Sequence, residues 1–165
     1  MAADYTVIIA VRQRFGDSPG GTVDSPGRDA DEYPQEEEAP FVGTSKDFVF
    51  DCPHIDRSQF GILQFNSLGV SHFNNLLQVN GVDVPGGLSV GPVSVYGPPY
   101  PPRWNTHSLL IERNVLTEHG NILHIESVAP LEFEQIDDFI IDNAVMWFKP
   151  QTGIRPPVGD LPQNK

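Results

Sequence analysis

Residues 76–87 read LLQVNGVDVPGG, and this stretch predicts a β-hairpin. The dipeptide Asn80-Gly81 is flanked by alternating apolar residues, Leu77 and Val79 before it and Val82 and Val84 after it. Asn and Gly tolerate the positive φ angles that a type I′ turn needs, and this turn has the twist of a two-residue hairpin. The chain is therefore expected to contain antiparallel strands joined by tight turns.

Other segments on both sides of this hairpin have β-branched or alternating apolar residues, which predict further strands. In chain order they are residues 5–11, 48–52, 60–65, 90–96, 106–113, 122–127 and 138–149. Pro92 cannot donate to a ladder, so residues 90–96 are expected at a sheet edge. Residues 138–149 are long enough for a helix, but their Phe, Ile, Val and Trp favour a strand with a bulge or bend at Asn143.

No segment gives a convincing helical pattern, and about eight to ten short strands separated by turn signals predict an all-β sandwich or barrel. The alternation within the strands also predicts which side chains form the core. These are Phe65, Leu77, Val79, Leu109, Ile111, Leu123, Ile125, Phe139 and Ile141, with either Trp147 or Met146.

The length of 165 residues suggests one domain, and 15 Gly and 16 Pro favour many short elements. We divide the chain into an N-terminal strand at 1–15, an acidic Gly/Pro-rich loop or arm at 16–44, a β-sandwich core at 45–149 and a proline-rich C-terminal tail at 150–165. The acidic segment has little apolar surface to bury, so alone it would be disordered or a long surface loop.

The formal net charge of −12 argues against binding to nucleic acid or to anionic membranes, which need a basic surface. It leaves solubility, or binding of divalent cations by clustered carboxylates. No apolar run approaches the length of a membrane span, and the first residues lack the basic region of a secretory signal. We expect a cytoplasmic chain or one released by a signal-independent route. The single cysteine, Cys52, excludes an intrachain disulfide.

Three stretches resemble parts of galactose-binding-like jelly rolls, the fold of many carbohydrate-binding modules. LTEHGNILHIES at 116–127 resembles a strand entry of these domains, and DDFIIDNAVMWFK at 137–149 resembles their closing strand. LLQVNGVDV at 76–84 resembles a hairpin of sugar-binding sandwich domains attached to glycoside hydrolases. The resemblance covers residues 45–149 and implies an antiparallel jelly-roll β-sandwich. Many such domains bind glycans through loops at one end and hold a structural calcium ion near the joined termini.

Residues 96–108, YGPPYPPRWNTHS, form an aromatic and proline-rich segment that cannot be helical. Tyr96, Tyr100 and Trp104 offer flat rings on which a sugar can stack. Side chains that could bond sugar hydroxyls follow closely, namely Arg103, Asn105 and His107. The alternative is that Trp104 begins a strand and plugs the end of the sandwich, with Tyr96 and Tyr100 as a contact surface for a sugar or a neighbouring subunit.

Asp137, Asp138 and Asp142 are the candidate ligands for Ca²⁺, which needs six to eight oxygens. Asp47 or Asp51 would complete the site if the first core strand lies beside the last. The alternative is that Asp137 and Asp138 cap a turn.

Cys52, His54 and Asp56 alternate in the sequence, but Pro53 and the lack of a second ligand cluster disfavour a metal site there. We expect His119 to be exposed.

The chain lacks the motifs of hydrolases, zinc proteases and phosphate-binding loops, so we predict that it is not an enzyme. The first hypothesis is a non-catalytic, lectin-like glycan-binding module. The alternative is a structural or assembly subunit of a larger particle or filament, in which the sandwich is the building block. The partners are then a glycan or neighbouring protein subunits, with a possible homo-oligomer.

Overall fold

The computed structural model describes residues 3–17, 39–70, 73–89, 104–129 and 136–152. All regular elements in these ranges are β-strands, which confirms the all-β prediction. They are β1 Asp4–Ile9, β2 Gln13–Phe15, β3 Ser45–Phe50, β4 Gly61–Leu68, β5 Leu76–Val79, β6 Val82–Asp83, β7 Asn105–Ile111, β8 Asn121–Glu126 and β9 Phe139–Phe148.

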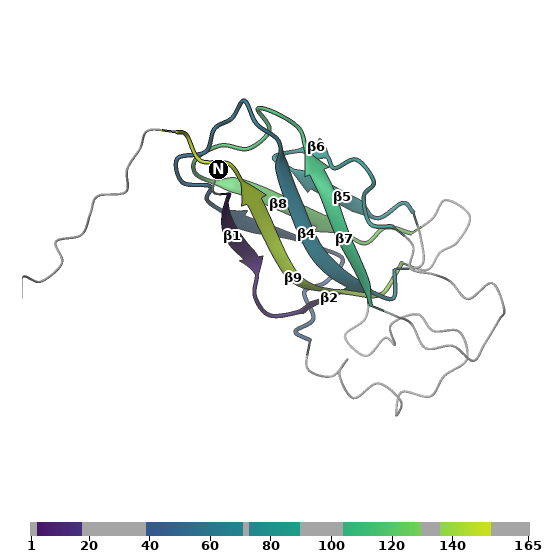
Figure 1. Ribbon diagram of the computed structural model, residues 1–165. Coiled ribbons are helices and arrows are strands. Elements are labelled where there is room, and N and C mark those ends of the chain that lie inside the picture. The colour runs from purple at the N-terminus through teal and green to yellow at the C-terminus, as the bar shows by residue number, and fades with distance from the viewer. Residues whose placement is uncertain (1–2, 18–38, 71–72, 90–103, 130–135, 153–165) are drawn as a thin grey trace, which may run out of the picture.

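The strands form two antiparallel sheets (Figure 1). The five-stranded sheet has the order β1-β9-β4-β7, and β2 pairs with the other half of β9. The four-stranded sheet has the order β3-β8-β5-β6. Residues from both sheets share one cluster of buried apolar side chains, so the arrangement is consistent with a β-sandwich.

The core follows the alternation seen in the sequence. Nine of the expected residues are buried, namely Phe65, Leu77, Val79, Ile111, Leu123, Ile125, Phe139, Ile141 and Met146. Leu109 is only partly buried and packs against the same cluster. Met146 rather than Trp147 fills the inward position near the end of β9, because Trp147 lies one residue further along and its side chain is on the opposite face.

The predicted hairpin is confirmed. Val79 of β5 pairs with Val82 of β6, and the turn residues Asn80 and Gly81 have φ angles of 53° and 76°. The Asn80 amide nitrogen donates to the Val115 carbonyl over 2.7 Å and to Asn121 Oδ1 over 2.9 Å. The turn is thereby fastened to the connection between β7 and β8.

The predicted irregularity at Asn143 is also confirmed. Gln64 of β4 pairs with Val145, whereas Asn66 pairs with Asp142, so β9 has one extra residue in this interval. Asn143 has a φ angle of 52°, as a bulge residue in the left-handed region does. As a result two consecutive polar residues, Asp142 and Asn143, lie between the buried Ile141 and Ala144.

The predicted N-terminal strand joins the five-stranded sheet, since both β1 and β2 pair with β9. The predicted strand at 90–96 lies outside the described residues, as do residues 18–38 of the acidic segment and 153–165 of the tail. The described part of the chain contains no helix that is long and apolar enough to cross a bilayer.

Candidate functional site

Of the six residues expected to bind a sugar, Tyr96, Tyr100 and Arg103 lie outside the described residues. Trp104 is 39% exposed, and the Arg12 guanidinium carbon lies 5.4 Å from the centre of its ring. Asn105 donates from its amide nitrogen to the Ser89 hydroxyl over 3.2 Å.

His107 is placed inside the protein. Its Nε2 atom lies 2.7 Å from the Ser67 hydroxyl and its Nδ1 atom 3.4 Å from that of Ser89. The imidazole stacks on Phe65 with a distance of 4.4 Å between ring centres. Burial lowers the pKa of His107, so its neutral form is favoured in the folded state.

The three aspartates expected at a calcium site are divided between two environments. Asp137 is buried and its Oδ2 atom accepts a hydrogen bond of 2.6 Å from Asn75, while its carbonyl accepts one from the Ser127 hydroxyl. Asp138 is buried against Gly16. Asp142 is on the outer face of β9, where its Oδ2 atom lies 3.7 Å from Arg12 Nη2.

The two further aspartates considered for this site also have partners. Asp47 Oδ1 lies 2.6 Å from His124 Nδ1, and Asp51 accepts from the Gly120 amide over 2.8 Å. Within the described ranges no three His, Cys, Asp or Glu residues form a group suited to a metal ion. Calcium binding remains a prediction, and a lower melting temperature after exhaustive chelation would support it.

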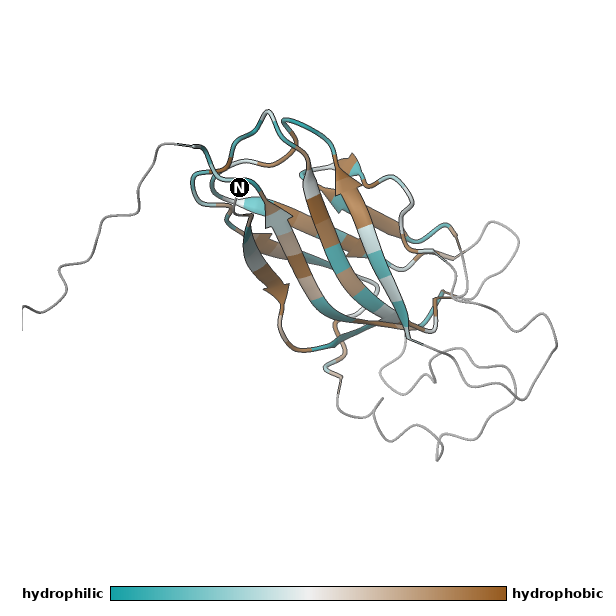
Figure 2. Cartoon of the chain, in the orientation of Figure 1, coloured by the Kyte–Doolittle hydropathy of each residue, from teal (hydrophilic) through white to brown (hydrophobic). Residues whose placement is uncertain are grey.

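The outer face of the five-stranded sheet has a strip of uncharged polar side chains. This polar strip consists of Gln64, Asn66, Thr106 and Asn143. The Thr106 hydroxyl donates to Asn66 Oδ1 over 2.8 Å. The strip forms an open depression of about 210 Å³, whose lining also includes Val145 and Trp147. In Figure 2, β7 changes from hydrophobic colours in its upper part to hydrophilic colours in its lower part, the part that contains Thr106.

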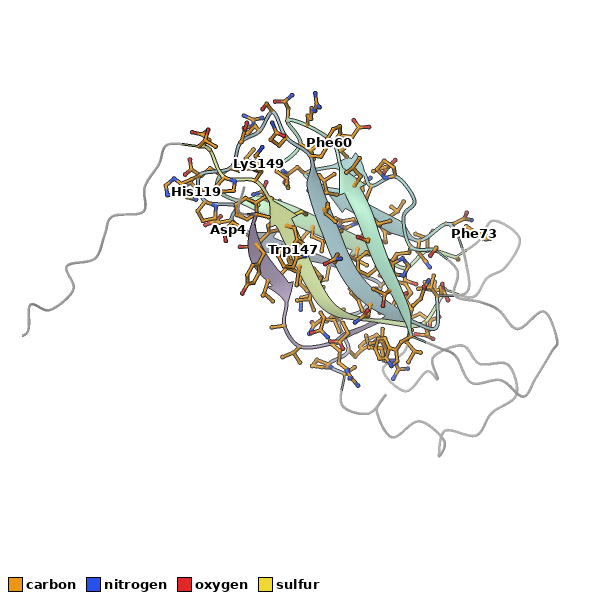
Figure 3. The ribbon with its side chains drawn as sticks, viewed as in Figure 1. Asp4, Phe60, Phe73, His119, Trp147 and Lys149 are labelled. Atoms are coloured by element: carbon orange, nitrogen blue, oxygen red, sulfur yellow. The ribbon has the colours of Figure 1, made fainter. Side chains whose placement is uncertain are left out.

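Trp147, which Figure 3 labels on β9, pairs with Ile62 and so lies at the Gln64 end of the polar strip, the upper end in this view. Its indole nitrogen donates to Gln64 Oε1 over 2.7 Å, and its ring centre lies 5.1 Å from that of Tyr5. These two contacts fix the ring while 36% of the residue stays exposed. The site therefore presents a flat apolar surface directly beside amide and hydroxyl groups.

Beyond Trp147 the outer face becomes apolar. Cross-strand pairing places Trp147 opposite Tyr5 on one side and Ile62 on the other, and Ile62 opposite Leu110. Tyr5, Trp147, Ile62 and Leu110 thus form an apolar row across four strands, and each is between 36% and 56% exposed.

Arg12 connects two residues that were predicted for different sites. It comes from the connection between β1 and β2, and its guanidinium contacts both the Trp104 ring and Asp142. Asp142 is paired in the sheet with Asn66 of the polar strip. The Arg12–Trp104 contact therefore lies at the lower end of the strip, opposite Trp147.

Sequence reasoning did not assign Arg12, Trp147 or any of the four strip residues to a binding site, although it considered Trp147 for the core and Asn143 for a bulge. A signal for part of the strip was present, because Gln64 and Asn66 alternate with the core residues Leu63 and Phe65 and so had to lie on the outer face. Nothing local indicated that Thr106 and Asn143 would lie beside them, since this depends on pairing between strands that are distant in the sequence.

The other residues considered for metal or nucleophile chemistry are buried or paired with a neighbour in the described part of the chain. Cys52 is fully buried and its pKa is raised to about 12, mainly by that burial. His54 lies 3.3 Å from Glu118, and Asp56 accepts from the Ser58 hydroxyl over 2.7 Å. His119 is exposed, as expected.

Comparisons of the chain with protein-family models, with curated proteins and with solved structures find no match.

Proposed function

We propose that the chain is a non-catalytic, lectin-like glycan-binding module whose site is the outer face of the five-stranded sheet. The proposal rests above all on the depression in which the exposed ring of Trp147 adjoins the polar strip. A sugar ring has an apolar C–H face and an edge of hydroxyl groups, so it is recognised by an aromatic plane next to hydrogen-bonding side chains.

The site is preorganised, which supports binding. The Gln64–Trp147 and Asn66–Thr106 hydrogen bonds hold four side chains in place before any ligand arrives. A ligand then loses less affinity to the ordering of side chains. The bulge at Asn143 contributes as well, because it adds an extra polar residue to the face.

We further propose a jelly-roll connection of the strands and membership among galactose-binding-like domains. The support is the sequence resemblance of residues 45–149 together with two antiparallel sheets around one core. The proposed site differs from the loop site that the resemblance implies. Of the expected residues, Trp104 lies at the lower end of its strip, whereas His107 faces the core.

A glycan array followed by titration calorimetry tests the function. We expect at least one glycan to bind, and Trp147→Ala and Asn66→Ala each to weaken its binding at least tenfold while melting curves show that both variants stay folded. Phe73→Ala is the matched control, because Phe73 is an exposed aromatic residue outside the depression. Binding that survives both Trp147→Ala and Asn66→Ala would place the site elsewhere, and an array without any hit would refute the function.

A second candidate function is that of an assembly subunit, and the apolar row favours it. Its side chains are more apolar than a sugar requires, and they are contiguous, as at protein contacts. Light scattering over a range of concentrations tests this function. A particle larger than a monomer that Ile62→Ser with Leu110→Ser dissociates, while glycan binding persists, would assign the row to assembly.

A further inference from the structure

Both tryptophans of the chain lie at the outer face of the five-stranded sheet, one at each end of the polar strip. Trp147 is in register with Ile62 of β4. Trp104 directly precedes Asn105, which is in register with Ser67. The Trp104 backbone therefore lies beside Leu68, at the end of β4. At about 3.3 Å per residue, the two backbone positions are about 20 Å apart along the strands.

The side chains at the two ends differ in their surroundings. The Trp147 ring is held by Gln64 and Tyr5. The Trp104 ring has the Arg12 guanidinium 5.4 Å from its centre, and Arg12 also lies beside Asp142. Each end therefore combines an exposed indole with groups that hydrogen-bond, which makes two places for a sugar ring rather than one.

Between the two ends, the strip residues on β4 and β7 offer hydrogen bonds but no charge. Asn66 Oδ1 accepts from Thr106, and within the described part of the chain the Asn66 amide nitrogen donates to no protein atom. Gln64 Nε2 is 3.5 Å from the Ser108 hydroxyl, a long contact that a ligand oxygen can replace. The strip thus has two amide groups on β4, those of Gln64 and Asn66, that can donate to ligand hydroxyl groups.

Charge narrows the class of ligand further. The formal net charge of the chain is −12, and among the described residues the ionic contact beside the strip pairs Arg12 with Asp142. A polyanionic glycan would be repelled by the protein as a whole, and it would meet neutral amides rather than cations along the strip.

We infer that the ligand is an extended, uncharged oligosaccharide that lies along β4, with one sugar unit on Trp147 and another on Trp104. This inference rests on the proposed glycan-binding function and specifies its substrate class. A monosaccharide reaches only one tryptophan, whereas a chain of several units reaches both and contacts Gln64 and Asn66 between them.

The test is titration calorimetry of the full chain with neutral oligosaccharides of increasing length. The probes are gluco-, manno-, xylo- and galacto-oligosaccharides, each as the monomer, the dimer, the tetramer and the hexamer, with the galacturonic acid hexamer as the charged counterpart. We expect at least one neutral series to bind with an affinity that rises tenfold or more from dimer to hexamer, and the charged hexamer to bind more weakly.

The variants separate the two ends of the site. Trp104→Ala and Trp147→Ala should each weaken binding of the hexamer at least tenfold. Each should also remove most of the rise in affinity with oligosaccharide length. Trp104→Phe and Trp147→Phe keep an aromatic ring and should restore part of the affinity, and Phe73→Ala should change nothing. Melting curves identify any variant that is misfolded, in which case the Phe variant carries the test.

Two results would overturn the inference and leave the proposed function standing. One is a dimer that binds as tightly as the hexamer, and the other is a charged hexamer that binds better than the neutral ones. The absence of binding by every probe, together with an empty glycan array, would instead remove the proposed function and the inference with it.

Discussion

At the scale of single residues, position 16 requires glycine because it lies against the buried side chain of Asp138. A Cβ atom at this position would lie 1.5 Å from Asp138 Oδ1, and the φ angle of Gly16 is 151°. Asp138 is 8% exposed, so it has little room to move. A side chain at residue 16 therefore forces the buried Asp138 carboxylate to move, whereas the nearest backbone atom, the Asp138 Cα, would be 3.5 Å from the added Cβ.

We therefore expect Gly16→Ala to lower the free energy of unfolding by about 3 kcal/mol, as overpacking of a well-filled site does. Gly43→Ala is the control, because Gly43 has a positive φ of 86° but a Cβ atom added there would have nothing within 4 Å. It should cost only the backbone strain, about 1 kcal/mol. Urea unfolding measures both, and equal losses would contradict the steric explanation.

Asn121 is a second residue with a large expected effect. It is fully buried, and its Oδ1 atom accepts from the Thr117 amide over 2.7 Å while its Nδ2 atom donates to the Thr117 carbonyl over 2.7 Å. It also accepts from Asn80 at the hairpin turn. One side chain thus satisfies polar groups of two connections.

Asn121→Ala should lower the free energy of unfolding by about 2–3 kcal/mol, because the partly buried amide and carbonyl of Thr117 lose their partner. Thermal melting and urea unfolding measure the loss. The control is Asn66→Ala, which removes an amide from the exposed strip and should change stability by less than about 0.5 kcal/mol. A loss at residue 121 as small as this would show that water replaces the missing side chain.

At the scale of elements, the bulge in β9 determines which side chains face the polar strip. Asn143 has a φ angle of 52°, which Gly adopts freely and a β-branched residue does not. We expect Asn143→Gly to keep the stability within about 1 kcal/mol and Asn143→Val to lower it by about 1–3 kcal/mol. Urea unfolding of the two variants compares them, and a Val variant as stable as the Gly variant would refute a strained bulge.

The strands show what the sequence alone could establish. The hairpin at Asn80-Gly81, the bulge at Asn143 and the inward positions of β8 follow from local patterns, and all are present. Trp147 was assigned to the core as an alternative to Met146, since alternation leaves the two faces of a strand undecided until its partners are known. The pairing of β9 with β1 and β4 determines which face Trp147 occupies. Its partners Tyr5 and Ile62 are more than 80 positions away in the sequence.

The candidate site was harder to predict for the same reason. Trp104 was identified by its aromatic neighbourhood, but its contact with Arg12 depends on the fold bringing the β1–β2 connection close to the start of β7. The polar strip combines residues from β4, β7 and β9. None of these strands indicates a site by its own sequence, because a few polar side chains on an outer face are ordinary.

At the scale of the whole molecule, two histidines give the stability opposite dependences on pH. The first is His107, whose folded-state pKa is lowered by burial. Below the unfolded value near 6.5, the unfolded chain takes up a proton that the folded chain does not bind. We expect the free energy of unfolding to fall as pH drops below 6.5, and His107→Gln, although less stable overall, to lack this part of the decrease. Urea unfolding between about pH 5 and pH 8 measures it, and parallel curves would contradict the lowered pKa.

His124 acts in the other direction. Its hydrogen bond with Asp47, with a second contact to Glu126, raises its pKa in the folded state. The stabilisation is complete below the unfolded value of 6.5 and is lost as pH rises through the raised folded value. His124→Gln should therefore be less stable than the natural chain at about pH 5.5 and approach it above the raised pKa. A difference in stability between the two proteins that grows with pH would refute the raised pKa of His124.

The buried thiol of Cys52 has a practical consequence. A thiol reacts as its thiolate, and a pKa of about 12 leaves almost no thiolate at neutral pH, while full burial excludes the reagent. Labelling by a thiol reagent must then wait until the segment after β3 opens. The labelling rate of the protein without substitutions measures how often that segment opens. Faster labelling in Gly16→Ala or Asn121→Ala would show which contacts keep this part of the protein closed.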